Sequence, residues 1–273
     1  CTLFCNTEAT AVEPYQVRLE DGQTLRARHV VDARGMPREE VEDCGFQKFV
    51  GHEIEFDEPH GITDPVLMDA TVDQTDGYRF FYLLPFSETR LLVEDTRFTS
   101  GDDLDPDEYR EGIARYVETS GWGPGELCRE EQGVLPMPWA GEIEEPRPGL
   151  VVAGYRGGWF HPGTGYSLPV AARLADAIAT QTPEEIDEGA LGGLRSRLQG
   201  QREYCHLLNR LLFRWYPPEM RWHVFARFYR MPQALVDRFY ALKLIASDRT
   251  RLLVGRPPRG FSIRHRVASG GKS

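Results

Sequence analysis

Residues 151–167 have the sequence Val151-Val152-Ala153-Gly154-Tyr155-Arg156-Gly157-Gly158-Trp159-Phe160-His161-Pro162-Gly163-Thr164-Gly165-Tyr166-Ser167. This order predicts an apolar strand, a glycine-rich loop and a helix whose N-cap is Thr164 or Ser167. The first turn of a helix presents free N–H groups and the positive end of a dipole, which suits an anionic oxygen. Glycines also let a backbone pass close to a flat ring. The segment is therefore either a cradle for a flat anionic ring or a loop that joins a strand to a core helix.

A reduced flavin is such a ring, but the loop is not the dinucleotide-binding fingerprint. Gly163-Thr164-Gly165-Tyr166-Ser167-Leu168 lacks the third glycine, and no strand directly precedes it. The pattern GxGxxG occurs nowhere else in the chain. If a flavin dinucleotide binds through a Rossmann unit, we expect that unit upstream of Cys1, and we interpret the chain as N-terminally truncated.

The residues before the loop predict two kinds of sheet. Tyr15–Leu19 and Thr24–Arg28 flank Asp21-Gly22 and predict a hairpin that leads into a short strand at His29–Ala33. Further β-type runs predict an antiparallel sheet inserted into a nucleotide-binding fold: Gln47–Phe56, Val66–Val72, Tyr78–Leu84, Arg90–Asp95 and Leu127–Val134. Helices are expected at Pro106–Thr119, at Ser167–Ile178 and, with breaks at prolines, from Pro183 onward.

Composition excludes several classes of protein. The chain has 273 residues and a net charge of −10, which argues against a nucleic-acid partner. No run of eighteen apolar residues occurs, and we expect that residues 1–5 are not part of a signal peptide. The five cysteines are scattered without metal-ligand spacing, so we expect no metal site and a reducing compartment.

Charge is distributed unevenly along the chain. Residues 201–273 hold 15 Lys or Arg against 4 Asp or Glu, whereas residues 1–200 hold 17 against 38. The basic region is also rich in aromatic residues, which is typical of helices that lie on an anionic membrane surface. The alternative is that these aromatic residues pack a helical subdomain.

Carboxylates lie at the ends of two apolar strands. Asp69 and Asp73 follow one strand, and Glu94 and Asp95 end the other. Burial there could raise a pKa and provide general acid–base chemistry or stabilise a cation, although solvated strand ends are the alternative. Glu130 and Glu131 are also adjacent, but neighbouring strand residues face opposite ways, so this pair cannot serve one site. In the glycine loop, His161 is either a proton relay or a hydrogen-bonded loop residue.

Taken together, these segments resemble the bacterial lycopene β-cyclase family. The resemblance extends from about Asp32 to Pro258, and its stretches are 47–51, 68–74, 76–80, 90–96, 129–133, 160–169, 207–213, 227–229 and 237–240. It implies an α/β fold of the FAD/NAD(P)-binding Rossmann-like, two-dinucleotide-binding flavoprotein type. The domains would be residues 1–40 as the end of the FAD-binding sheet, 41–146 as an antiparallel substrate domain, 147–183 as the flavin-binding strand, loop and helix, and 184–273 as a basic helical membrane-associated region.

The resemblance also implies an activity. Such an enzyme cyclises the ends of lycopene to β-rings, giving γ-carotene and then β-carotene, without net redox change. It would use reduced FAD, with NAD(P)H as the electron source. A flavin-dependent monooxygenase or oxidoreductase that acts on an apolar lipid or isoprenoid is the alternative.

The family's acidic motif falls on Leu92-Val93-Glu94-Asp95-Thr96. The implied proton donor or cation stabiliser is Glu94 with Asp95, and Asp69 and Asp73 rank second. The implied flavin contacts are Gly154, Gly157, Gly158, His161, Pro162, Gly163, Thr164, Gly165 and Tyr166. Because carotenes reside in bilayers, we expect a cytoplasmic protein bound peripherally to the inner face of the bacterial membrane, with Arg214, Arg221, Arg227 and Arg230 available for lipid head groups.

Overall fold

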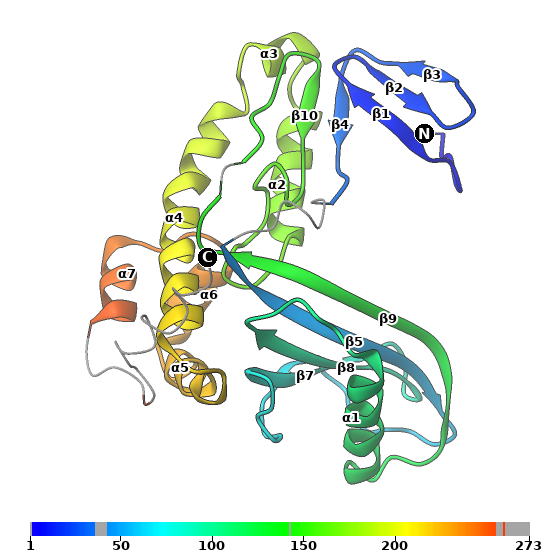
Figure 1. Ribbon diagram of the computed structural model, residues 1–273, viewed down its shortest axis with the longest axis vertical. Coiled ribbons are helices and arrows are strands. Elements are labelled where there is room, and N and C mark those ends of the chain that lie inside the picture. Colours follow the sequence, from blue (N-terminus) through cyan, green and yellow to red (C-terminus); the bar gives the residue numbers. More distant parts are fainter. Residues whose placement is uncertain (1, 36–42, 142, 255–258, 260–273) are drawn as a thin grey trace, which may run out of the picture.

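The computed structural model describes residues 2–35, 43–141, 143–254 and 259, and Figure 1 shows the course of the chain. The first strands are β1 Ala9–Glu13, β2 Gln16–Leu19, β3 Thr24–Arg26 and β4 Val30–Asp32. The central elements are β5 Cys44–Phe56, β6 Val66–Asp69, β7 Tyr78–Pro85, β8 Arg90–Thr99, α1 Pro106–Thr119, β9 Gly125–Pro138 and β10 Leu150–Val152. The last are α2 Leu168–Ala179, α3 Pro183–Asp187, α4 Gly192–Trp215, η2 Pro218–Met220, α5 Trp222–Phe228, α6 Gln233–Tyr240 and α7 Ala246–Leu253.

The described strands form three sheets. β1, β2 and β3 form an antiparallel sheet, and β10 pairs in parallel with β4 although more than a hundred residues separate them in the sequence. The third sheet is antiparallel in the order β6-β7-β8-β5-β9 and lies at the other end of the molecule (Figure 1). The long helix α4 connects the two ends, because it contacts β5 and β9 of the large sheet and follows α3 at the small one.

Helix α1 covers one face of the large sheet. Asp105 caps its N-terminus by accepting a hydrogen bond from the Asp107 N–H, and Pro106 occupies the first turn, where a missing N–H costs nothing. The helix buries Tyr109 and Ile113 in an apolar cluster with residues of β5, β7 and β8. We call this side of the sheet the α1 face.

The opposite face packs against the C-terminal helices. Phe98 of β8 lies in an apolar cluster with Phe213 of α4 and Phe225 of α5. A side chain at Gly45 would collide with the Phe213 ring, so a glycine is needed where α4 crosses β5. Buried Arg221 donates hydrogen bonds to the carbonyl oxygens of Phe98 and Phe213 and thereby ties the start of α5 to the sheet.

The expected elements correspond closely to those of the structure. The N-terminal hairpin, the antiparallel sheet and the helix at Pro106–Thr119 are all present. The acidic strand extends beyond Asp95 to Thr99, so Glu94 and Asp95 lie within β8 and not at its end. The expectation that Arg221 is available to lipids is wrong, because its side chain is 1% exposed. None of the described helices combines the length and apolarity needed to cross a membrane.

Candidate active site

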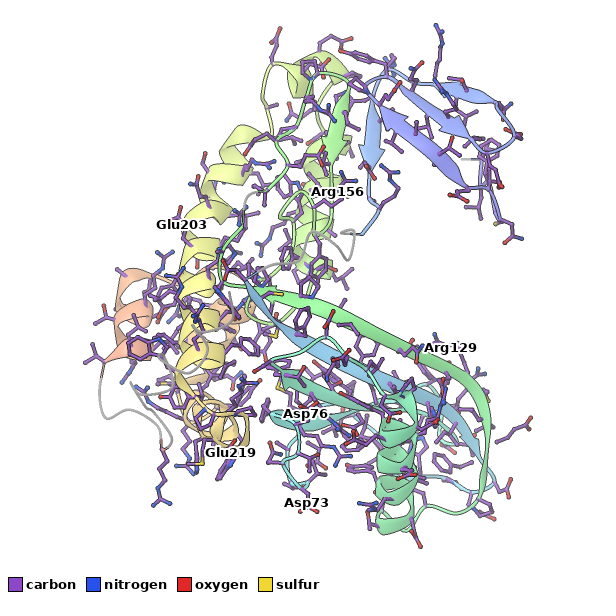
Figure 2. The ribbon with its side chains drawn as sticks, viewed as in Figure 1. Asp73, Asp76, Arg129, Arg156, Glu203 and Glu219 are labelled. Atoms are coloured by element: carbon purple, nitrogen blue, oxygen red, sulfur yellow. The ribbon has the colours of Figure 1, made fainter. Side chains whose placement is uncertain are left out.

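The glycine loop follows β10, which is fully buried beside β4. A side chain at Gly157 would overlap the Val152 carbonyl oxygen, and the Trp159 indole donates a hydrogen bond to that same oxygen. The close approach therefore explains the glycine. Figure 2 shows Arg156 beside this loop, where its guanidinium meets the Asp32 carboxylate at the end of β4.

His161 holds the loop to helix α6. Its Nδ1 accepts a hydrogen bond from the Gly163 N–H, so Nε2 carries the proton and donates it to the Phe239 carbonyl oxygen at 2.9 Å. Burial lowers the pKa of His161 to about 4. The ring is therefore neutral near pH 7 with both nitrogens bound to backbone, and it positions the loop instead of relaying protons.

The second half of the loop has the chemistry that a flavin ring requires. The Ser167 and Leu168 N–H groups at the start of α2 have no protein acceptor among the described residues, as is usual in a first helical turn. Gly165 lies against Gln47 of β5, whose buried Oε1 also lacks a partner within the described chain. The unpaired N–H donors at the start of α2 and the unpaired Gln47 Oε1 acceptor, both close to Gly165, fit a flat ring that carries hydrogen-bond acceptors as well as donors. Gly163–Ser167 and Gln47 are thus the residues that would hold it.

Glu94 lies on the sheet face that the loop approaches. In the register of β5, β7, β8 and β9, Glu94 is opposite Gly51 and Tyr82, and Gly51 is in turn opposite Glu131. Gln47 and Phe98 form another cross-strand pair, four residues along β5 and β8 from Gly51 and Glu94, and this even spacing places them on the same face. We call this side the acid face.

The environment of Glu94 favours its protonated form. The side chain is 9% exposed, and burial raises its pKa to about 7 against the effect of a 2.7 Å hydrogen bond from the Thr96 hydroxyl to Oε1. The nearby negative charges of Glu131 and Asp95 act in the same direction as burial. Near neutral pH the group can therefore either give or take a proton, which is the condition for general acid–base catalysis.

Asp95 points to the α1 face, away from Glu94. Its carboxylate is fully buried and binds Arg79 through three contacts of 2.7–3.1 Å and Arg97 at 3.2 Å. Arg97 in turn contacts Glu108 and lies 4.0 Å over the Tyr109 ring. These contacts make Asp95 the centre of a buried ion network that joins β7, β8 and α1.

Asp69 and Asp73 are also separate from Glu94. Asp69 accepts hydrogen bonds from Thr71 and from the Tyr116 hydroxyl of α1, and these bonds hold its pKa below the usual value although burial opposes them. Asp73 is exposed, and Figure 2 places it at the end of the molecule remote from Arg156. Of the four predicted carboxylates, the structure brings only Glu94 to the acid face beside the loop. No group of three or more potential metal ligands occurs in the described part of the chain.

Sequence reasoning missed Tyr82 and Thr96. Tyr82 is the cross-strand neighbour of Glu94, and Thr96 is its hydrogen-bond donor two residues along β8. Strand alternation alone puts Thr96 on the same face of β8 as Glu94. The position of Tyr82 opposite Glu94 depends on the register between β7 and β8, which the sequence does not give.

Comparison with known proteins shows the family of the chain. The family model described as "Lycopene cyclase protein" matches residues 3–265. The chain belongs to this family. It is 44% identical to a lycopene beta-cyclase of Pantoea ananas over 94% of this chain and 68% of that protein. It is 45% identical to a lycopene beta-cyclase of Paracoccus sp. over 88% of this chain and 64% of that protein. The chain thus spans about two thirds of the length of these cyclases.

The fold is shared with a more remote protein. A geranylgeranyl bacteriochlorophyll reductase-like protein from Thermoplasma acidophilum superposes with a TM-score of 0.54 at 14% identity, covering 90% of this chain and 66% of that one. The predicted fold, a Rossmann-like α/β fold with an inserted antiparallel sheet and a helical C-terminal region, is confirmed.

Proposed function

We propose that the protein acts as a lycopene β-cyclase, with Glu94 as the acid. The observation that carries this proposal is the buried carboxyl of Glu94, whose pKa is raised to about 7, on the sheet face next to the glycine loop. The reaction requires a proton on a terminal double bond, closure of the ring by the resulting carbocation, and loss of a proton from the neighbouring carbon. It is redox-neutral, so the protein must mainly deliver a proton and keep water from the cation.

The contacts of Glu94 suit both proton steps. Thr96 occupies Oε1, and Oε2 has no hydrogen-bond partner among the described residues, which leaves one oxygen for substrate. After it gives its proton, the carboxylate carries a negative charge in a buried site, where it stabilises a nearby cation more strongly than it would in water. The aromatic ring of Tyr82, opposite Glu94, is a second group suited to a cation.

A flavin would bind at the loop. Gly163–Ser167 and Gln47 would hold its ring, and FAD, reduced by NAD(P)H, would supply negative charge and a share of the acid–base work beside the substrate. The N–H groups at the start of α2 favour the anionic form by the same physical argument that places phosphates at helix N-termini. Tyr155 donates a hydrogen bond to the Gly165 carbonyl oxygen and stacks on Phe160, which fixes the shape of the loop.

Pigment analysis tests the proposed activity. The complete coding sequence that contains this chain is expressed in bacteria that accumulate lycopene, and carotenoids are extracted and separated. We expect γ-carotene and β-carotene. Unchanged lycopene in cells with confirmed soluble protein would contradict the proposal, and oxygenated products would indicate a flavin-dependent monooxygenase instead.

We also propose that the C-terminal region docks on the cytoplasmic surface of the membrane. Arg210 and Arg214 of α4, together with Trp215 and Trp139, line a surface hollow of about 480 Å³, and Arg230 is exposed near α5. Arg227 contributes little, because its guanidinium donates to the Leu252 and Val254 carbonyl oxygens. Basic and aromatic groups in one place suit anionic head groups.

Vesicle flotation tests this docking. We expect the protein to float with vesicles that contain phosphatidylglycerol and to be released by salt, because each basic residue near an anionic surface contributes about 1 kcal/mol. Reversal of two charges in Arg210→Glu/Arg214→Glu should weaken binding at least ~10-fold. The matched control is Arg18→Glu/Arg26→Glu, on exposed positions of β2 and β3, which should float like the parent. Equal flotation of both double variants would exclude the α4 surface.

A further inference from the structure

A cavity of about 330 Å³ lies where the glycine loop meets the C-terminal helices. Gly163 and Thr164 of the loop form one wall, Met68 and Phe98 of the sheet form another, and side chains from α4 to α7 close the remainder. This volume falls at the lower end of the range for small-molecule pockets, about 300–1,000 Å³. At about 30 Å³ for each water-sized group, the cavity has room for roughly eleven such groups. A long chain molecule would therefore place only one segment in the cavity.

The polar side chains around this cavity already bind protein groups. The Asn209 amide donates to the carbonyl oxygens of Pro138 and Pro162 at 2.8 Å each. The Arg227 guanidinium is bound to backbone carbonyls of α7 and the residue that follows it. The Tyr229 and Tyr240 hydroxyls bind each other, and Tyr229 also contacts the Met68 sulfur.

These contacts select the chemistry of a ligand. A polar ligand would lose its hydrogen bonds to water and would find the surrounding groups engaged, which costs several kcal/mol for each unpaired group. A hydrocarbon has no hydrogen bonds to water to lose, and its transfer out of water is favourable. The cavity therefore favours an unfunctionalised apolar chain over a lipid with a head group.

Tyr82 connects the acid to the wall of the cavity. It lies opposite Glu94 on the acid face, and Phe98 of the cavity wall is on that same face of β8. The Tyr82 ring meets the Phe80 ring edge to face at 5.1 Å between centroids, and Phe80 in turn meets the Phe98 ring of the cavity wall at 5.6 Å, so a continuous row of aromatic rings connects the neighbour of Glu94 to the cavity.

We propose that this cavity binds the end segment of a long, unfunctionalised polyene hydrocarbon and presents it to Glu94, with the Tyr229–Tyr240 pair on its wall. The assignment rests on the proposed function and names the substrate site within it. The tyrosine faces that border the cavity would stabilise a cation that forms at this end of the chain.

Filling the cavity tests the proposal. Val224→Trp and Leu253→Trp each add bulk to a cavity-lining side chain, and Val254→Trp adds the same bulk at a neighbouring exposed position outside the cavity. Lycopene in detergent micelles is added to the flavin-loaded full-length protein in the Glu94→Gln background, and the pigment that remains with the protein after gel filtration is measured from its visible absorbance. We expect at least fivefold less bound pigment in the two cavity variants, an unchanged amount in Val254→Trp, and the same flavin spectrum in all three.

The outcomes separate this inference from the proposed activity. If both cavity variants fold, as judged by thermal melting, and bind as much pigment as their parent, the cavity is not the substrate site. If Val224→Trp does not fold, Leu253→Trp decides, because its side chain is already 44% exposed. If the parent does not cyclise lycopene but the cavity variants lose bound pigment, the proposed reaction fails and the binding site stands.

Discussion

Glu94→Gln should reduce lycopene cyclisation at least ~100-fold and up to ~10,000-fold, which is the range for loss of a general acid. The substitution keeps the size of the side chain and its capacity to accept the Thr96 hydrogen bond, but it removes the transferable proton. Product formation at saturating lycopene, measured by chromatography, gives the effect on kcat. The flavin absorbance of the purified variant shows in parallel whether the ring site is intact.

The matched control is Asp73→Asn, because Asp73 is exposed and remote from the loop. It should change turnover by less than about twofold, as is typical of an exposed surface position. Glu94→Gln with turnover like that of the parent would exclude a proton role for this residue. Activity of the parent should also fall as the pH rises above about 7, because a proton donor must be protonated and the pKa of Glu94 is about 7.

Stability provides a second readout for Glu94. The pKa of this carboxyl is about 7 in the folded protein and about 4.5 in an unfolded chain, so the folded state retains the proton over this interval. Below pH 4.5 this carboxyl therefore does not destabilise the folded state. The folded state loses stability as the pH rises from 4.5 to 7, and above pH 7 it carries the full cost of a buried, ionised carboxylate. Glu94→Gln removes a cost on the order of 3 kcal/mol and should melt at a higher temperature than the parent at pH 8, but not at pH 4.

Asp95→Ala should destabilise the protein by about 3–5 kcal/mol, the usual cost of leaving buried charges without a partner. The substitution leaves the Arg79 guanidinium without its carboxylate partner between the sheet and α1, and Arg97 keeps its contact with Glu108. Urea unfolding followed by circular dichroism measures the loss. Residual turnover per folded molecule should stay close to that of the parent, because Asp95 faces away from the loop.

The double variant Asp95→Ala/Arg79→Met distinguishes an ion network from a catalytic carboxylate. Removal of both partners should restore part of the lost stability, since Arg79 no longer remains as an unpaired buried charge. A catalytic Asp95 would behave differently: folded Asp95→Ala protein would have normal stability and no turnover. That pair of results would return Asp95 to the active site.

The sequence predicted the elements well because their signals are local. The capping residue and proline at Asp105-Pro106 mark the start of α1, and the Asp21-Gly22 turn fixes the first hairpin. The glycine loop was predictable for the same reason, because Gly157 is required by its close contact with Val152, only five residues earlier.

The composition of the site was less predictable because it depends on register and on distant segments. The alternation that separates Glu130 from Glu131 also separates Glu94 from Asp95, and applying it to both pairs would have assigned Asp95 to the other face from sequence alone. Which face carries the acid depends on the α1 packing and on the contact between Gly165 and Gln47. Arg221 donates hydrogen bonds to the carbonyl oxygens of Phe213 in α4 and of Phe98, a strand residue more than a hundred positions earlier. The burial of Arg221 therefore has no signal in the sequence around it.

Gly163 and Thr164 belong at once to the loop that would hold the flavin and to the wall of the hydrocarbon cavity, and His161 fixes that shared segment to α6. The two ligands would therefore be in thermodynamic linkage. If a bound polyene changes the affinity for reduced flavin by some factor, reduced flavin changes the affinity for the polyene by the same factor. If that factor differs between the reduced and oxidised rings, the substrate shifts the midpoint potential of its own cofactor, and an enzyme of a redox-neutral reaction acquires a redox response to its supply of hydrocarbon.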